Sequence, residues 1–521
     1  MSTAQIPLNG FGQETGSLQP NIVFIITDDM SWAHLGAYGN DEVETPNLDR
    51  LALEGVVFEN AFVSTPSCTP SRASILTGRN GFELEEGATL WGYLPAKFPT
   101  YTELLAEHGY RVGATGKGWA PGFLIDRDVN PAGRPYNQIR RKPFGDQFDS
   151  LAMSDIDYTA NFEAFLDSTD ADRPFSFWIG TFEPHRGYTR GVAAARGKDT
   201  ALATVPAFLP DVSTVREDIN EYYAEIEHVD DHVGRVMEVL NKRGLQDNTV
   251  VVFTSDNGMP FPRAKATLYD YGTRMPLIVW WGDNIDGGQR INEFASHTDI
   301  APTFLEIAGV AAPSEMSGRS LVSLLTTGEP GGASRDAVYM YRERHGFYPG
   351  TGGMSFPSRA IRTQDYLLIW NARPDAMPSD VDGSPTKSYL EENAGEFPSL
   401  HALSFGTRGE YELYDVRTDA FQMHNLAGDE DYADVFHRLR SQLFAYLESR
   451  RDPRILGDAA SFRYAPYFGV VFTPELLQWT PEQQGQELTF EERRDLLRKA
   501  YSTIGEIEFF QRMIAEQAGR L

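Results

Sequence analysis

The residues best suited to chemistry in this sequence lie in the stretch 64–79, around its single cysteine, Cys68. Pro70 suits the first turn of a helix, and Gly78 suits the far end of a short one. We therefore expect Cys68 just before a helix N-terminus, where free backbone N–H groups and the helix dipole favour an anion. Arg72 follows four residues later and can lie on the same face. This combination predicts a site for a tetrahedral oxyanion, with a buried structural cysteine as the alternative.

Oxygen-bearing side chains follow two short apolar runs, 21–27 and 249–254. Both runs are rich in β-branched residues and predict buried parallel strands. The side chains that follow them are Asp28, Asp29, Asp256 and Asn257. Ligand sites of open α/β sheets lie at the carboxyl ends of strands, and adjacent carboxylates repel each other unless a cation neutralises them. Such hard oxygen ligands suit calcium, or magnesium less well, while a solvated turn or helix cap is the alternative for the aspartate pair.

Basic and imidazole side chains follow two further predicted strands. Lys117 and His185 each come just after such a strand, although a histidine in this position is more often structural than catalytic. His228 and His232 lie four residues apart on a helix predicted over 217–243. No glutamate lies between them in the manner of a zinc-binding HExxH motif, so we interpret this pair as structural.

The cysteine and its neighbours, C-T-P-S-R-A-S-I-L-T-G-R, resemble the signature of type I sulfatases of the alkaline-phosphatase superfamily. In that family the cysteine is oxidised after synthesis to formylglycine, whose hydrated aldehyde is the nucleophile. The resemblance implies maturation by a formylglycine-generating enzyme and a sulfated oligosaccharide or polysaccharide fragment as substrate. It implies catalytic roles for Cys68, Arg72, Lys117, His185 and Lys265. It also implies a calcium ion, or magnesium, bound by Asp28, Asp29, Cys68, Asp256 and Asn257.

Other motifs, D-N-G-M-P-F-P, E-P-H-R and the loop R-E-R-H, resemble the sulfamidase (heparan N-sulfatase) branch. This resemblance implies that four residues border the substrate and can bind a sugar carboxylate, although a surface arginine is the alternative. They are Arg186, Arg344, His345 and Arg359. The chain departs from the family at Trp119, where the pattern Gly-Lys-x-His has a histidine. Because an indole cannot take a proton, that role is vacant, moved to another residue or passed to water.

Composition limits the class of protein. The 521 residues include 46 basic and 74 acidic side chains, a net charge of −28, which argues against a general nucleic-acid binder. One cysteine excludes an intrachain disulfide, and no apolar run is long enough to span a bilayer. The first 20 residues lack the basic and apolar regions of a signal peptide. We therefore expect a cytoplasmic protein, or a periplasmic or secreted one if a leader has been removed.

The predicted fold is α/β, with a large, mostly parallel sheet flanked by helices and a smaller C-terminal subdomain that contains an antiparallel sheet. The expected divisions are a flexible leader (1–20), a catalytic domain (21–330), the subdomain (331–450) and a helical tail (451–521). Strands of the subdomain are expected at 337–342, 358–363, 366–370 and 410–414, followed by a helix over 431–450.

Three functions are compatible with these residues. The first is a sulfatase that removes an O-linked or N-linked sulfate from a saccharide. The second is a phosphonate or phosphate diester hydrolase of the alkaline-phosphatase superfamily, against which Asn257 and the two lysines argue, because that group usually has a histidine at this position. The third is a non-catalytic glycan-binding relative, suggested by Trp119. The sequence indicates neither the oligomeric state nor the sugar.

Overall fold

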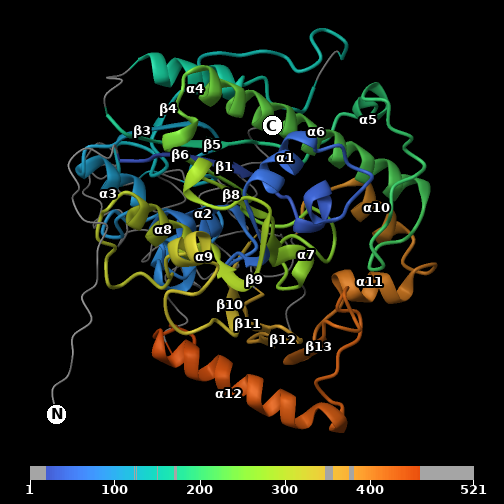
Figure 1. Ribbon diagram of the computed structural model, residues 1–521. Helices are drawn as coiled ribbons and strands as arrows, with labels where there is room; N and C mark the ends of the chain where they lie inside the picture. The colour runs from blue at the N-terminus through green and yellow to red at the C-terminus, as the bar shows by residue number, and fades with distance from the viewer. Residues whose placement is uncertain are drawn as a thin grey trace, which may run out of the picture.

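The computed structural model describes residues 19–457 except 123, 125, 149–150, 169–172, 346–355 and 375–380. Within these residues the chain forms two separate sheets, one of nine strands and one of four (Figure 1). Residues 1–18 of the predicted leader (1–20) and residues 458–521 of the predicted helical tail (451–521) lie outside the described residues.

The large sheet contains every described strand before residue 300. Its strands are β1 (Asn21–Thr27), β2 (Val56–Phe62), β3 (Arg111–Gly116), β4 (Arg134–Pro135), β5 (Phe175–Gly180), β6 (Thr249–Ser255), β7 (Arg274–Met275), β8 (Leu277–Trp280) and β9 (Gln289–Ser296). Strands β4, β3, β5, β1 and β6 lie side by side in parallel, and β6 then pairs with β8 in antiparallel orientation. The prediction of a mostly parallel sheet is confirmed.

Helices cover both faces of this sheet. They are α1 (Pro46–Glu54), α2 (Cys68–Thr77), α3 (Tyr101–Glu107), α4 (Tyr158–Asp167), α5 (Val192–Ala195), α6 (Ser213–Lys242), α7 (Asp270–Thr273), α8 (Ile300–Ile307) and α9 (Val322–Thr327). Alternate residues of β1 enter two different cores: Phe24 packs with α2 and α8, whereas Val23 packs with α1, α4 and α6. Both faces of β1 are therefore buried, which is why its apolar run is continuous instead of alternating between apolar and polar residues.

The small sheet consists of β10 (Ala337–Arg342), β11 (Ser358–Thr363), β12 (Tyr366–Asn371) and β13 (Tyr411–Asp415), paired antiparallel in that order. One face packs on the large sheet, and α12 (Ala433–Ser449) covers the other through Leu439, Leu443 and Leu447 (Figure 1). Helices α10 (Pro385–Glu392) and α11 (Pro398–Phe405) lie between β12 and β13 in the chain. The expected antiparallel sheet is confirmed, with strand ends within one residue of the predicted ones.

Helix α4 starts at Tyr158, because the Asp157 carboxylate accepts a hydrogen bond from the Ala160 N–H and caps the helix there. The helix expected from residue 217 starts earlier, at Ser213. None of the described helices is both long and apolar enough to cross a membrane.

Candidate active site

Cys68 is the first residue of α2, and the backbone of Ser67 caps the helix in an extended conformation. Every residue of α2 is buried, and Gly78 ends the helix with a φ of 65°, in the left-handed region. A side chain at Gly78 would come within 2.9 Å of the Met316 sulfur. Cys68 therefore lies at the N-terminus of α2, one residue inside the helix rather than just before it.

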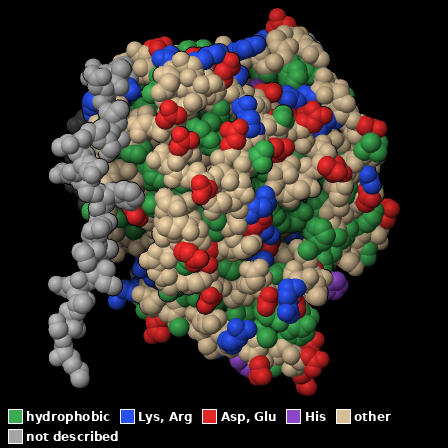
Figure 2. Space-filling model, in the orientation of Figure 1, with side chains coloured by type: hydrophobic (Ala, Val, Ile, Leu, Met, Phe, Trp, Pro, Cys, Tyr) green, Lys and Arg blue, Asp and Glu red, His purple; other side chains and the backbone are tan. Residues whose placement is uncertain are grey.

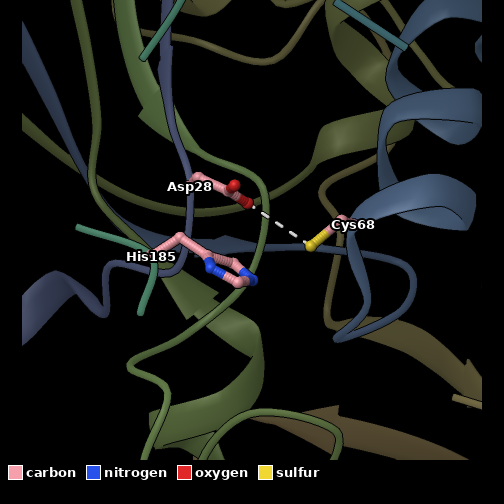
Figure 3. A group of neighbouring side chains, drawn as sticks. All are labelled: Asp28, Cys68 and His185. Carbon is pink, nitrogen blue, oxygen red and sulfur yellow. Dashed lines mark hydrogen bonds between the residues drawn. The ribbon is translucent and has the colours of Figure 1, made fainter. Parts of the chain in front are cut away.

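Acidic side chains from two strand ends surround this thiol. The Cys68 sulfur lies 3.3 Å from Asp28 Oδ1 and 3.9 Å from Asp29 Oδ1. Asp28 and Asp29 follow β1, and Asp256 follows the adjacent β6, whose residue Ser255 is in register with Thr27. One possible ligand atom from each of Asp28, Asp29, Cys68 and Asp256 lies within 4.8 Å of the others. Figure 3 shows Asp28 directed at the sulfur, with the His185 imidazole beside them.

These residues fit a divalent cation. Asn257 is fully buried, its amide nitrogen donates to Asp256 Oδ1 at 2.6 Å, and its Oδ1 accepts no hydrogen bond from the described residues. A buried carbonyl oxygen without a donor is costly unless something absent here, such as an ion, binds it. Burial raises the pKa of Asp29 to about 7 despite Lys265, and that of Asp256 to about 6 despite Arg72. Crowded, buried carboxylates of this kind are stabilised by a hard cation.

Arg72, predicted to have a catalytic role beside Cys68, is held by the surrounding protein. Its Nε donates to Asp256 Oδ2 at 2.7 Å, and its Nη1 donates to the backbone oxygens of Lys117 and Gly118 at 2.7 and 3.1 Å. The side chain is fully buried, and Nη2 points toward Asp28 Oδ1 at 3.7 Å. The guanidinium therefore orients Asp256 and the carbonyls of Lys117 and Gly118, while its Nη2 forms no hydrogen bond with a described residue.

Two buried lysines flank the aspartate pair. Lys117 Nζ donates to Asp28 Oδ2, and Lys265 Nζ donates to Asp29 Oδ2 at 2.6 Å. Burial raises the pKa of Asp28, but Lys117 and other cations outweigh burial and hold that pKa far below its usual range. Burial lowers the pKa of Lys265, but Asp29 and Asp382 outweigh it and raise that pKa well above its usual range. Both lysines are therefore charged at neutral pH.

A cavity of about 740 Å³ opens over Cys68. Lys117, His185 and Lys265 line it, and His185 Nε2 lies 3.7 Å from Asp29 Oδ2. Asp382 also lines it and accepts from Lys265 Nζ at 2.7 Å. Sequence reasoning missed Asp382, which precedes α10 in a polar segment without a strand or recognisable motif to mark it.

The four residues predicted to border the substrate have different environments. Arg359 is the clear correction: it is fully buried and forms ion pairs with Glu343 at 2.9 Å and with Asp452 Oδ1 at 3.0 Å. It is therefore neither a substrate ligand nor a surface arginine, because both buried carboxylates require its charge. Arg186 lines the cavity, but its two Nη atoms donate to Asp218 at 2.7 and 2.8 Å.

The other two predicted substrate residues, Arg344 and His345, are both buried, at 3% and 4% exposure. His345 lines the cavity, and its Nδ1 lies 2.8 Å from the hydroxyl of Ser67, the residue before Cys68. Arg344 is not among the described residues that line the cavity. Of the predicted substrate residues, the structure thus brings His345 and Arg186 to the cavity wall.

Trp119 is 2% exposed and belongs to the hydrophobic core that contains α2 and α8. It is not among the described residues that line the cavity, although Lys117 and Ala120 on either side of it are. The interpretation of His228 and His232 as structural agrees with the geometry. His232 Nδ1 lies 3.0 Å from the Thr159 hydroxyl, and the two imidazoles pack edge to face with centroids 4.9 Å apart.

The Cys68 thiol lies in an unfavourable place for a thiolate. Burial and the neighbouring Asp28 raise the pKa of this thiol well above its usual range, although Lys117 opposes them. Reactive cysteines in proteins occupy electropositive, partly exposed positions instead. The arrangement as a whole combines a helix-end residue, an acidic cation site, two lysines and an imidazole at the base of one cavity.

Comparisons with known proteins agree with this arrangement. Residues 20–310, more than half of the chain, match the family model described as Sulfatase. Residues 263–377 match a second model, described as N-sulphoglucosamine sulphohydrolase, C-terminal. An ulvan-active sulfatase of Formosa agariphila is 28% identical over 84% of this chain and 81% of its own length. The human N-sulphoglucosamine sulphohydrolase is 28% identical over 83% of this chain and 91% of its own.

Solved structures share the fold. One, in complex with its substrate D-glucosamine-2-N,6-O-disulfate, superposes with a TM-score of 0.61 at 22% identity, over 83% of this chain and 98% of its own. The phosphonate monoester hydrolase of Agrobacterium radiobacter superposes with a TM-score of 0.60 at 19% identity, over 83% and 96%. Because both identities are low, these likenesses concern the fold alone.

Proposed function

The chain belongs to the sulfatase family and is a sulfuric ester hydrolase that acts on sulfated saccharides. We propose that a formylglycine derived from Cys68 and a bound calcium ion carry out the reaction. The observation that supports this most is the convergence of Asp28, Asp29, Cys68 and Asp256 within 4.8 Å. Asn257, with its unpaired Oδ1, completes an all-oxygen set once the sulfur is replaced by oxygen.

Replacement of the thiol also resolves an electrostatic conflict. A thiol between carboxylates is a poor nucleophile, because those charges oppose its ionisation. The hydrated aldehyde of a formylglycine, made by a separate formylglycine-generating enzyme, supplies a hydroxyl that attacks sulfur and a second hydroxyl that allows the sulfate to be expelled. A bound calcium ion supplies positive charge for the sulfate oxygens and favours deprotonation of the nucleophile.

The remaining site residues hold charge and protons. Lys117 and Lys265 line the cavity, both with their Nζ atoms next to the aspartate pair, and bind the sulfate oxygens on which charge accumulates in the transition state. His185 or Lys265 protonates the leaving oxygen or nitrogen. His345, fixed through Ser67, takes the proton-transfer role left open by Trp119, because it is the other described imidazole on the cavity wall. Arg72 orients Asp256 and Asp28.

The proposed substrate is a sulfated oligosaccharide or polysaccharide fragment. Two comparisons support different linkages: the second family model favours an N-sulfated glucosamine, and the Formosa agariphila relatives favour O-sulfated ulvan. The test is free sulfate release, measured by ion chromatography, from an N-sulfated glucosamine disaccharide and from O-sulfated ulvan and glycosaminoglycan oligosaccharides. Release from at least one saccharide is expected, and release from the N-sulfated sugar alone identifies a sulfamidase.

A phosphonate monoester and a phosphate diester serve as controls in the same assay, because the fold is shared with a phosphonate monoester hydrolase. Faster turnover of either control than of every sulfated sugar would contradict the proposal. Metal analysis of the purified protein adds an independent readout, for which calcium is the expected ion.

A further inference from the structure

Glu225 is a buried acid that the proposed reaction does not use. It lies in the middle of α6 and is 2% exposed, yet it lines the same cavity as Cys68 and His185. Among the described residues, none forms a hydrogen bond with its carboxyl group; its interactions are electrostatic, with Glu183 and Glu221. Its carboxyl oxygens are not among the fully enclosed atoms that lack a hydrogen-bond partner, so they reach the cavity.

The two neighbouring glutamates, Glu183 and Glu221, differ from Glu225 in that protein groups donate hydrogen bonds to them. Glu183 accepts from the Ser154 N–H and from the Tyr158 hydroxyl, each at 2.7 Å. Glu221, one turn before Glu225 on α6, accepts from the N–H groups of Gly191 and Ala193 at 2.6 and 2.9 Å. Both carboxylates therefore accept hydrogen bonds from the protein, whereas none of the described residues donates one to Glu225, whose carboxyl group faces the cavity.

The position of Glu225 relative to the reaction centre follows from Glu183. The Glu183 backbone oxygen accepts from the Asp28 N–H at 3.1 Å, and His185 follows two residues later. Lys117, Lys265, His185, Glu183 and Glu225 all line this one cavity. A sugar whose sulfate is bound by the lysines would share the cavity with Glu225.

Burial and the neighbouring Glu183 and Glu221 raise the pKa of Glu225 well above its usual range. A carboxyl group offers acceptor oxygens, and its protonated form adds one O–H donor. A sugar hydroxyl has the same two capacities and forms a reciprocal pair with such a group. An anionic substituent at this point would instead meet the Glu183 carboxylate.

We propose that Glu225 is a specificity-determining residue that binds a hydroxyl of the sugar carrying the scissile sulfate. This inference rests on the proposed function and adds the substrate class: the ring has a free hydroxyl, rather than a second sulfate or a carboxylate, where it faces α6. Recognition through a buried hydrogen bond is selective, since a substrate without the hydroxyl leaves the protein group unpaired.

The test compares Glu225→Ala and Glu225→Gln with Glu238→Gln, an exposed position on the same helix paired with Lys242. The substrates are the sulfated saccharide that the wild type cleaves best and 4-nitrophenyl sulfate, which has no sugar hydroxyl. For Glu225→Ala we expect the ratio of kcat/KM on the sugar to that on the aryl sulfate to fall about tenfold or more. Glu225→Gln, which keeps one donor and one acceptor, retains most of this ratio, and Glu238→Gln leaves both rates unchanged.

Several results would overturn the inference. An equal loss of kcat/KM on both substrates in Glu225→Ala would show that Glu225 supports the structure of the site and does not recognise the sugar. A loss for Glu225→Gln as large as for Glu225→Ala would indicate that an ammonium group, not a hydroxyl, is bound. A wild type that releases sulfate from the aryl ester and from no sugar would contradict the proposed saccharide substrate instead.

Thermal unfolding provides a readout independent of activity. Because Glu225 has no hydrogen bond in the free protein, Glu225→Gln should leave Tm unchanged or raise it, as expected for a residue retained for function. Glu221→Gln, one turn away and satisfied by two N–H groups, should lower Tm, because an amide NH₂ would face a backbone donor. An equal fall in Tm for both variants would show that the Glu225 carboxyl stabilises the fold.

Discussion

At the scale of single residues, the charges of the site come in pairs. Lys117 contacts Asp28, Lys265 contacts Asp29, and Arg72 contacts Asp256. Each cation opposes the effect of burial on the pKa of its carboxylate partner. The two lysines also line the cavity, whereas Arg72 is not among the described residues that line it, so substitution can separate their roles.

Removal of the Lys117 ammonium should slow the reaction and, because it leaves the buried Asp28 without its ion-pair partner, also lower the free energy of unfolding. For Lys117→Ala we expect a fall in kcat on the order of 10²–10³, the effect of deleting one preorganised donor to a developing oxyanion. Steady-state sulfate release measures it. The control is Lys97→Ala, whose exposed side chain pairs with Glu85. A Lys117→Ala enzyme with wild-type kcat would show that this lysine is not a sulfate ligand.

His345 is expected to act through its imidazole rather than through packing. His345→Gln retains a polar side chain that can still bond the Ser67 hydroxyl but cannot transfer a proton. We expect kcat to fall by about 10²-fold or more, the usual contribution of a positioned acid–base group, with the acidic limb of the pH–rate profile altered. An unchanged profile in His345→Gln would leave water as the proton carrier in place of the missing family histidine.

At the scale of elements, the site is assembled where β1, β3, β5 and β6 end and α2 begins. The sequence was sufficient for this part, because apolar β-branched runs predict buried parallel strands whose carboxyl ends share one edge. It was insufficient for Asp382 and Glu225, which reach the cavity from a polar segment and from mid-helix. A polar residue facing a cavity has no sequence signal that separates it from one facing solvent.

Metal removal tests whether a cation links the ligands that follow β1 and β6 to the N-terminus of α2. Without a cation, Asp28, Asp29 and Asp256 repel each other in a buried place. We expect EDTA to lower Tm and calcium to restore it, since ligand at about 100 times its Kd contributes about 2.7 kcal/mol. Differential scanning calorimetry measures this without any need for turnover. In Asn257→Ala the response to calcium should shrink, and a Tm insensitive to chelator in the wild type would exclude a structural role for the cation.

Arg359 links β11 to Asp452, beyond the end of α12. Arg359→Ala should lower the free energy of unfolding by about 3–5 kcal/mol, because Asp452 and Glu343 lose a buried partner, although Arg454 still contacts Glu343. Urea denaturation measures the loss. Arg417→Ala, half-exposed and next to the same small sheet, is the matched control with a change of about 0.5 kcal/mol or less. A raised KM with unchanged stability in Arg359→Ala would restore its predicted role as a substrate ligand.

At the scale of the whole molecule, an acidic protein can bind an anionic substrate because its cavity is lined by positive side chains. The chain carries a net charge of −28, and on the face drawn in Figure 2 acidic and basic side chains are interspersed rather than gathered. The positive groups that matter lie buried in the cavity, where water does not screen them. The small sheet and α12 close one side of the large sheet, and the segment before α10 contributes Asp382 to the cavity (Figure 1).

The proposed reaction depends above all on the conversion of Cys68 to formylglycine. Sulfate release per mole of converted enzyme tests this dependence most directly. The fraction of Cys68 changed to formylglycine is obtained from the mass of its peptide, in preparations made with and without the formylglycine-generating enzyme. Sulfate release from the preferred sugar should rise in proportion to that fraction and disappear in Cys68→Ala. Near-normal release by Cys68→Ala, or by protein with an entirely unconverted thiol, would contradict the account.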